Sequence, residues 1–170
     1  MQKAAQVLIV MGSESDLPVM QEAADILESF NVPCEMRISS AHRSPVRTAA
    51  LASEAAGRGI RVVIAGAGMA AHLAGVVAAE TLLPVIGVPM PGGALNGVDA
   101  LYATVQMPGG IPVATMAIGK AGAKNAGIFA VQILALSDAQ LAESLKKYRR
   151  EMETDVDRRD AELQVARSQA

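Results

Sequence analysis

The sequence predicts an α/β protein in which helices cover both faces of a mostly parallel sheet. Short apolar runs rich in Val and Ile alternate along the chain with longer segments whose apolar residues recur at helical spacing. The connections between these segments are short and contain Gly, Pro, Ser or Asp. This alternation is typical of right-handed crossover units, which produce a three-layer α/β/α sandwich.

Five segments are expected to be strands. The first is a short apolar run with β-branched residues, followed by turn-forming residues, and the others come in turn between the helical segments. They are residues 6–10, 34–38, 60–65, 85–88 and 113–118.

Helices are expected between the strands. The first follows Gly12-Ser13-Glu14-Ser15-Asp16 and carries apolar residues from Met20 to Phe30 at helical spacing. The second begins at Ser44-Pro45, with a capping hydroxyl followed by proline at the first helical position, and runs to about Gly57. Three more helices are expected. They are at residues 70–80, at residues 123–135, and between them a short helix that follows the Pro- and Gly-rich loop 89–97 and ends at about residue 106.

A charged C-terminal helix is expected from Asp138 to about residue 164. Its apolar residues form one narrow stripe, predicted to dock on the body or on a neighbouring subunit. The stripe consists of Leu141, Leu145, Tyr148, Met152 and Val156. From about Val165 the chain has too little apolar content to be held firmly. The arrangement predicts a flavodoxin-like sandwich, with residues 1–170 as a single domain whose core spans about 6–136.

Composition narrows the possible partners. A net charge of −2 lacks the basic excess of a nucleic-acid-binding protein. One cysteine, Cys34, cannot form an intramolecular disulfide, and no leader segment precedes the first strand, so a cytoplasmic location is expected. The weakly charged stretch 62–119 is long enough to suggest a membrane span, but its glycines and prolines favour a sheet core.

The helices expected at residues 70–79 and 123–135 have almost no charged residues on their outer faces. This predicts a homo-oligomer whose interfaces are lined by small residues.

Three loops carry candidate site residues, because ligands of parallel sheets bind beyond the carboxyl ends of the strands. In the first, Ser13 and Asp16 suit a phosphate or polyol, although both are also ordinary helix caps. In the second, His42 can carry a proton beside the fixed cation of Arg43. In the third, His72 is equally consistent with a ligand contact and with a packed histidine.

Other chemistries fit poorly. The segment Gly66-Ala67-Gly68 with the following residues resembles a dinucleotide fingerprint, but it follows the third strand, and Val88 stands where the acidic residue is needed. Its glycines are expected to let the backbone approach a ligand. Two distant histidines and Cys34 do not make a zinc site, and neither a phosphate loop nor a nucleophile elbow is present.

Taken together, the loop motifs resemble those of the PurE family of purine biosynthesis. The resemblance is close, runs from Val7 to about Leu136, and rests on four motifs in order. They are Val10-Met11-Gly12-Ser13-Glu14-Ser15-Asp16, Ser40-Ala41-His42-Arg43, Ala65-Gly66-Ala67-Gly68 with Ala70-Ala71-His72-Leu73, and Val105-Gln106-Met107-Pro108-Gly109-Gly110-Ile111-Pro112-Val113.

The resemblance implies the bacterial mutase activity, which converts N5-carboxyaminoimidazole ribonucleotide to 4-carboxy-5-aminoimidazole ribonucleotide. It further implies a cytoplasmic homo-octamer that uses neither metal nor organic cofactor and acts on a small ribonucleotide. His42 is then the general acid and base. The resemblance places the other site residues around the substrate. Ser13 and Asp16 are implied at its ribose and phosphate end, Arg43 at phosphate, and Ser40, Gly66, Ala67, Gly68 and His72 around the aminoimidazole and its carboxylate.

Two positions depart from the family pattern: Met69 stands where Gly is usual, and Ala74 where Pro is usual. Both lie beside the third loop, the segment in which relatives that carboxylate aminoimidazole ribonucleotide directly with CO2 differ most. Direct carboxylation is therefore the second reading. A non-catalytic nucleotide-binding module of the same fold is the third, because this fold hosts many functions.

Overall fold

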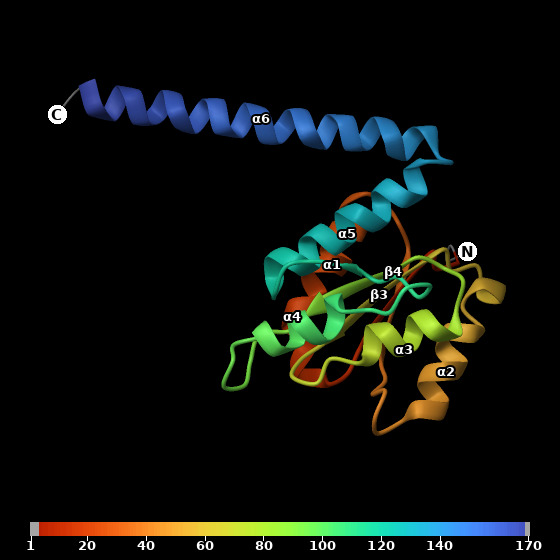
Figure 1. Cartoon of the computed structure of the whole chain (residues 1–170). Coiled ribbons are helices and arrows are strands. Elements are labelled where there is room, and N and C mark those ends of the chain that lie inside the picture. The colour runs from red at the N-terminus through yellow and green to blue at the C-terminus, as the bar shows by residue number, and fades with distance from the viewer. Residues whose placement is uncertain (1–3, 169–170) are drawn as a thin grey trace.

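The computed structural model describes residues 4–168 and contains a five-stranded, fully parallel sheet (Figure 1). The strands, in spatial order, are β2 (Cys34–Ile38), β1 (Val7–Met11), β3 (Val62–Ala67), β4 (Val85–Pro89) and β5 (Ala114–Thr115). This 2-1-3-4-5 order is that of the flavodoxin-like fold, whose topological switch point lies between β1 and β3. The predicted fold class is confirmed.

Alternating residues of the central strands build two cores. Val7 and Ile9 face one side of the sheet with Ile64, whereas Leu8 and Val10 face the other. All five are fully or almost fully buried. The strands read as continuous apolar runs because a parallel sheet is covered on both faces.

Helices cover both faces, as Figure 1 shows. They are α1 (Leu17–Ser29), α2 (Pro45–Ser53), α3 (Leu73–Glu80), α4 (Val98–Val105), α5 (Lys120–Ala135) and α6 (Ala139–Ser168), with 3-10 turns η1 (Glu14–Asp16) and η2 (Ala56–Arg58). Helices α1 and α5 pack together over one face, and α2 packs beside α3 over the other. Helix α4 joins the second face, where a Cβ at Gly87 of β4 would lie 2.5 Å from Thr104 Cγ2.

Several element boundaries differ from the sequence prediction; α5, for example, begins at Lys120, three residues earlier than expected. Helix α2 ends at Ser53, and η2 with a left-handed Gly59 (φ 92°) completes the connection. Helix α3 begins three residues later than expected, because the preceding residues form tight turns. Strand β5 has two residues, since beyond Thr115 the chain follows β4 through only isolated bonds, including one from Met116 N–H to the Gly87 carbonyl.

Small residues of α5 serve contacts within this chain. A Cβ at Gly127 would lie 2.9 Å from the Ala23 carbonyl oxygen and from Ile26 of α1. The close approach of the two helices therefore requires glycine there. Part of the uncharged surface of α5 that was expected to contact other copies is thus covered by α1 and α6.

Helix α6 leaves the body as a long arm (Figure 1). The Asp138 side chain caps it by accepting hydrogen bonds from the N–H groups of Gln140 (2.9 Å) and Leu141 (3.1 Å). Of the predicted stripe, Leu141, Leu145 and Tyr148 pack against the core. Met152 and Val156 do not, and are 40% and 65% exposed.

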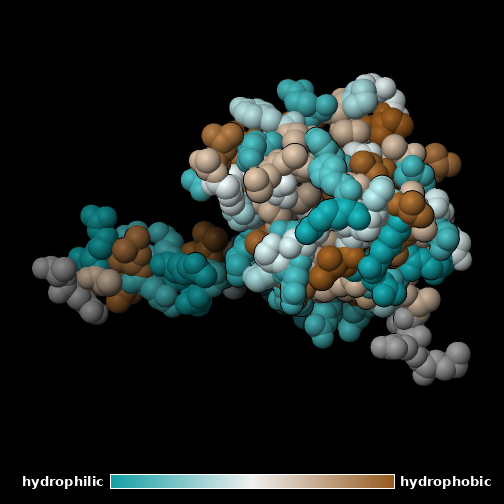
Figure 2. All heavy atoms as spheres, turned by 90° about the horizontal axis from the view of Figure 1, so that it is seen from below, coloured by the Kyte–Doolittle hydropathy of each residue, from teal (hydrophilic) through white to brown (hydrophobic). Residues whose placement is uncertain are grey.

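The end of the arm remains helical. Residues 165–168, expected to be loosely held, continue the helix with exposed side chains, and residues 169 and 170 lie outside the described residues. In Figure 2 the arm is mostly hydrophilic with separate hydrophobic spots, and the visible face of the body carries several such spots. Within residues 4–168, no helix combines the length and the apolar character needed to span a membrane.

Candidate functional site

A crevice of about 440 Å³ lies beyond the carboxyl ends of β1 to β4. This volume falls in the usual range for sites that bind small ligands. The crevice is at the topological switch point between β1 and β3, where open parallel sheets bind ligands. Four loops line it: the first (residues 12–16), the second (39–44), the third (66–72) and the fourth (90–97).

The first loop is organised by Ser13 and Asp16. The Ser13 N–H donates to Asp16 Oδ2 (3.0 Å), and the Ser15 N–H donates to Ser13 Oγ (3.4 Å). Burial raises the pKa of the Asp16 carboxyl, against the opposing effect of hydrogen bonds from the Ser13 and Gly12 backbone. Both residues therefore cap the turn, as the simpler reading predicted, and both also line the crevice.

The second loop rests on a buried hydroxyl network. Ser39 and Thr48 are at most 2% exposed, and their hydroxyl oxygens lie 2.8 Å apart. Ser44 was expected to cap α2, but its hydroxyl makes no capping bond. It donates instead to the Ser40 carbonyl (3.1 Å) and accepts from the Ser40 N–H (3.0 Å), which closes the loop on itself. The proline at the first helical position, Pro45, is as predicted.

The two histidines of the chain meet in the crevice. His42 Nε2 lies 2.7 Å from His72 Nδ1, and the rings stand edge to face with centroids 4.9 Å apart. Arg43, beside His42, donates from Nη2 to the Gly12 carbonyl (3.2 Å) and so connects the second loop to the first. A proton carrier, a fixed cation and hydroxyl groups are thus together, which suits binding an anion and moving a proton.

Only some residues of the third loop line the crevice. Ala67, Gly68 and His72 line the crevice, with His72 at the N-cap position of α3 rather than inside its first turn. A Cβ at Gly68 would lie 3.3 Å from Met90 Cβ. Gly66 is not among the lining residues, and its missing side chain has a role in packing. A Cβ there would lie 2.4 Å from the Met20 sulfur, so its missing side chain makes room for the core.

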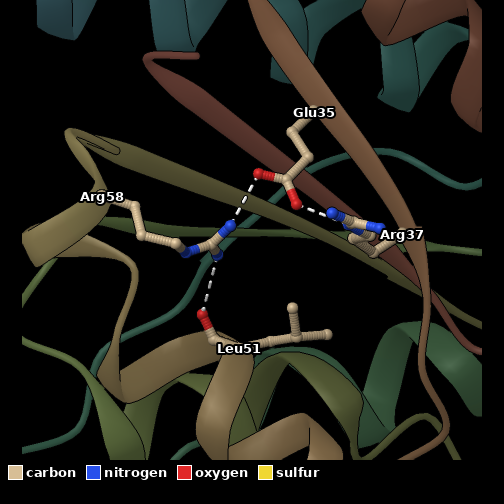
Figure 3. A network of polar contacts seen from close by, with 4 residues as sticks. All are labelled: Glu35, Arg37, Leu51 and Arg58. Atoms are coloured by element: carbon tan, nitrogen blue, oxygen red, sulfur yellow. Dashed lines mark hydrogen bonds and ion pairs between the residues drawn. The ribbon is translucent and has the colours of Figure 1, made fainter. Parts of the chain in front are cut away.

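An ion-pair network holds the elements on either side of the second loop (Figure 3). Glu35 on β2 accepts a hydrogen bond from Arg37 and pairs with Arg58 Nη1 at 2.7 Å, and Arg58 also donates to the Leu51 carbonyl (3.4 Å). The pKa of Glu35 is lowered, chiefly by the hydrogen bond from Arg37 and then by the positive charge of Arg58. The network joins β2 to the end of α2, so the loop between them starts and ends on connected supports.

Sequence reasoning missed several lining or supporting residues. Met90, Pro91, Gly92 and Gly93 form the wall that follows β4. Their position after a strand was a usable signal, but they carry no titratable group. The support from Ser39 and Thr48 could not be inferred, because it joins residues on different elements. In the described part of the chain, no three histidine, cysteine or acidic side chains gather as a metal site.

Known proteins resemble this chain over most of its length. The sequence pattern of the AIR carboxylase family matches residues 6–155. The N5-carboxyaminoimidazole ribonucleotide mutase of Synechocystis sp. is 57% identical over 156 residues, covering 92% of this chain and 88% of the relative. The mutase of the same name from Escherichia coli K12 is 53% identical over 152 residues, covering 89% and 90%.

A solved structure agrees with the fold. The crystal structure of Treponema denticola PurE superposes with a TM-score of 0.84 at 30% identity, covering 92% of this chain and 97% of that one. The family pattern covers far more than half of the chain, and the two relatives are well above 30% identical. The chain belongs to the AIR carboxylase family, which is the PurE family that its loop motifs resemble.

Proposed function

We propose that this protein is an N5-carboxyaminoimidazole ribonucleotide mutase. It converts its substrate to 4-carboxy-5-aminoimidazole ribonucleotide, a step of purine biosynthesis. The observation that carries the proposal is the contact of His42 with His72 in the switch-point crevice, in a chain whose relatives at 53% to 57% identity bear that name. The crevice supplies the proton carrier and the anion contacts that the reaction needs.

The proposed reaction has two half-steps with one proton carrier. Protonated His42 delivers a proton to the carbamate nitrogen, the N–C bond to the carboxylate breaks, and CO2 is released beside the ring. Ring carbon C4 then attacks this CO2, and neutral His42 removes the C4 proton to restore aromaticity. No net proton is consumed. Confinement keeps CO2 at a high effective concentration next to C4.

The histidine contact supports this role. A hydrogen bond between His42 Nε2 and His72 Nδ1 requires one of these two nitrogens to be without a proton. Of the four ring nitrogens, the two that face each other share one hydrogen. The pair in contact therefore carries at most one positive charge. A singly charged pair can donate one proton to the carbamate, and the neutral pair can accept the one from C4.

The remaining residues hold the substrate in this proposal. Ser13 and Asp16 contact the ribose and phosphate end, and Arg43 binds phosphate with the N–H groups that it does not direct to Gly12. Ser40, His72 and the backbone of Ala67 and Gly68 surround the aminoimidazole and its carboxylate. Gly66 contributes indirectly, by allowing Met20 and Met90 to pack beneath the third loop.

The proposal includes a single domain, residues 1–170, acting in the cytoplasm as a homo-oligomer, with eight copies expected from the resemblance. The exposed apolar residues of the α6 arm, such as Val156, support association of copies.

Every bond change in the proposed reaction is a proton transfer or a transfer of CO2 between nitrogen and carbon. The chemistry therefore needs neither a metal nor an organic cofactor, and the partner is a ribonucleotide.

The test follows product formation by ultraviolet absorbance from two starting points. One assay contains fresh N5-carboxyaminoimidazole ribonucleotide, and the other contains aminoimidazole ribonucleotide with bicarbonate. We expect fast conversion in the first alone. Efficient conversion in the second at low CO2 would replace the mutase with a direct carboxylase, and binding without conversion in both would leave a nucleotide-binding module.

A further inference from the structure

Met69 adopts a backbone conformation that its side chain makes costly. Its φ is +54°, in the left-handed region. Among the described residues, two other non-glycine residues share this region, Asn31 and Asn96. Asparagine tolerates it because its short polar side chain can bond locally, whereas methionine has no such compensation. Strain of this kind persists where the surrounding structure imposes it, and it is often found at functional sites.

The Met69 side chain stands at the rim of the crevice. It lines the crevice and is nevertheless 65% exposed. Its Cγ lies 3.7 Å from the position of a Cβ on Gly93, in the fourth loop. The side chain therefore extends from the third loop toward the fourth. Gly93 (φ +63°) has no side chain of its own to fill this space.

The backbone connects Met69 to the histidine pair. The Met69 carbonyl accepts the N–H of Ala71 (2.9 Å), and the Ala70 carbonyl accepts the N–H of His72 (2.9 Å). These successive tight turns bring His72 to within 2.7 Å of His42. Met69 therefore directly precedes the turns that place His72, and its side chain lines the same crevice as the histidine.

We propose that Met69 is a retention residue, whose thioether side chain covers the open side of the crevice and hinders escape of the CO2 released from the substrate. This inference rests on the proposed mutase function. When the N–C bond breaks, CO2 either bonds to C4, with the C4 proton passing to His42, or leaves through the opening and aminoimidazole ribonucleotide is released. CO2 is small, neutral and poorly held by hydrogen bonds, so a flexible apolar side chain at the opening suits its confinement.

The experiment compares the wild type with three variants. Met69→Gly removes the cover, and glycine takes a positive φ without steric cost, so the fold is kept. Met69→Leu restores an apolar side chain of similar size. Asn31→Gly is the matched control, because Asn31 has almost the same φ (+55°) and is not among the residues that line the crevice. Circular dichroism and sedimentation of each variant verify fold and assembly.

Each protein is given fresh N5-carboxyaminoimidazole ribonucleotide in buffer that contains ¹³C-bicarbonate and carbonic anhydrase, with a blank lacking enzyme subtracted. Mass spectrometry measures the ¹³C fraction of the product, and absorbance measures aminoimidazole ribonucleotide released per product formed. We expect both to rise at least about threefold in Met69→Gly, since lost confinement favours escape over recapture. We expect Met69→Leu and Asn31→Gly to resemble the wild type.

Unchanged ratios in Met69→Gly, beside normal turnover of the wild type, would overturn the retention role alone. An equal rise in Met69→Leu would also overturn it, because covering bulk would then not be the cause. A wild type that forms no product would overturn the mutase function and this inference with it. The two failures are therefore distinguishable in one set of assays.

Discussion

His42 Nε2 and His72 Nδ1 lie 2.7 Å apart, although the residues are separated by 30 positions in the chain and belong to different loops. The edge-to-face rings leave one hydrogen to be shared along this line. One imidazole is therefore the donor of this hydrogen bond and the other is the acceptor. The two side chains should behave as one unit in catalysis.

A double-mutant cycle tests this unit. We expect His42→Asn to lower kcat by roughly 10² to 10⁴, the usual contribution of a general acid and base. His72→Asn should lower it less, because His42 remains. The double variant should be no worse than His42→Asn alone, since residues that act together have non-additive effects. Steady-state kinetics on the four proteins checks this, and independent, multiplicative losses would show that the contact has no role in turnover.

Asp16→Asn should change the stability of the fold and the binding of substrate in opposite directions. Burial raises the pKa of Asp16 above its usual 3.8, so its ionisation disfavours the fold. The destabilisation caused by ionising Asp16 is absent well below pH 3.8 and reaches its full size above the raised pKa of the folded protein. Relative to the wild type, the Asn variant should therefore gain stability as pH rises through this range. We expect its kcat/KM to fall about 10- to 100-fold through a lost charged hydrogen bond.

Urea unfolding at pH 3 and pH 7, together with steady-state kinetics, measures both effects of Asp16→Asn. The matched control is Asp25→Asn on the exposed side of α1, where the carboxylate accepts a hydrogen bond from Gln21. It should leave kcat/KM unchanged. An equal loss of kcat/KM in the two variants would remove Asp16 from the binding site.

Gly122→Ala should destabilise the start of α5. A Cβ at Gly122 would lie 1.6 Å from the Ala117 carbonyl oxygen, so the backbone must move. We expect a loss of roughly 3 kcal/mol in the free energy of unfolding, the upper part of the usual range for overpacking. Gly57→Ala is the control, because no described residue other than its chain neighbours has an atom within 4 Å of the added Cβ. Urea unfolding that gives equal stability for both variants would disprove the packing described for α5.

Glu35→Gln should weaken the support of the second loop in a pH-dependent manner. The pKa of Glu35 is lowered from 4.5, so its ion pairs stabilise the fold above that pH, and the effect is lost as pH falls through the lower folded value. Because Arg37 and Arg58 are partly exposed, we expect only about 0.5 kcal/mol at pH 7. Urea unfolding at several pH values should show the two proteins converging in acid; a constant difference would contradict the assignment.

Tyr148→Ala should show where α6 stops contributing to the body. The Tyr148 ring packs edge-on against Phe30, with centroids 5.5 Å apart and planes at 62°. We expect a loss of about 1 to 2 kcal/mol in the free energy of unfolding. Met152→Ala, one turn further along the exposed arm, should have no measurable effect within a single chain. Sedimentation at concentrations where copies associate then measures whether Met152→Ala weakens the association. A weaker association would indicate that Met152 lies at a contact between copies.

Local chemistry accounts for the elements that the sequence predicted well. Strands β1, β3 and β4 differ from the predicted bounds by one or two residues, because continuous buried apolar runs identify parallel strands. Strand β2 has the predicted bounds, although it contains Glu35 and Arg37 and is only partly buried. The loops that carry Ser13, His42 and His72 were found for a related reason: polar residues directly after such strands gather at one edge of the sheet.

Where a residue had two possible partners, only the folded structure shows which one it contacts. Ser44 had a capping hydroxyl in sequence, but the Ser40 backbone takes it. Gly66 had the signature of a ligand-facing glycine, but Met20 fills the space beside it. The stripe of α6 follows one helical period, yet only its first part finds a core to cover. None of these choices is visible in local spacing.

The sequence by itself determined the order of strands and helices, the parallel sheet and the loops that hold the candidate site, since periodicity and turn chemistry act over a few residues. Only the tertiary structure decided that His42 meets His72, that Arg43 reaches Gly12, and that Met69 extends toward Gly93. Such contacts depend on the packing of strands and loops far apart in sequence, and this packing sets distances that no local pattern encodes.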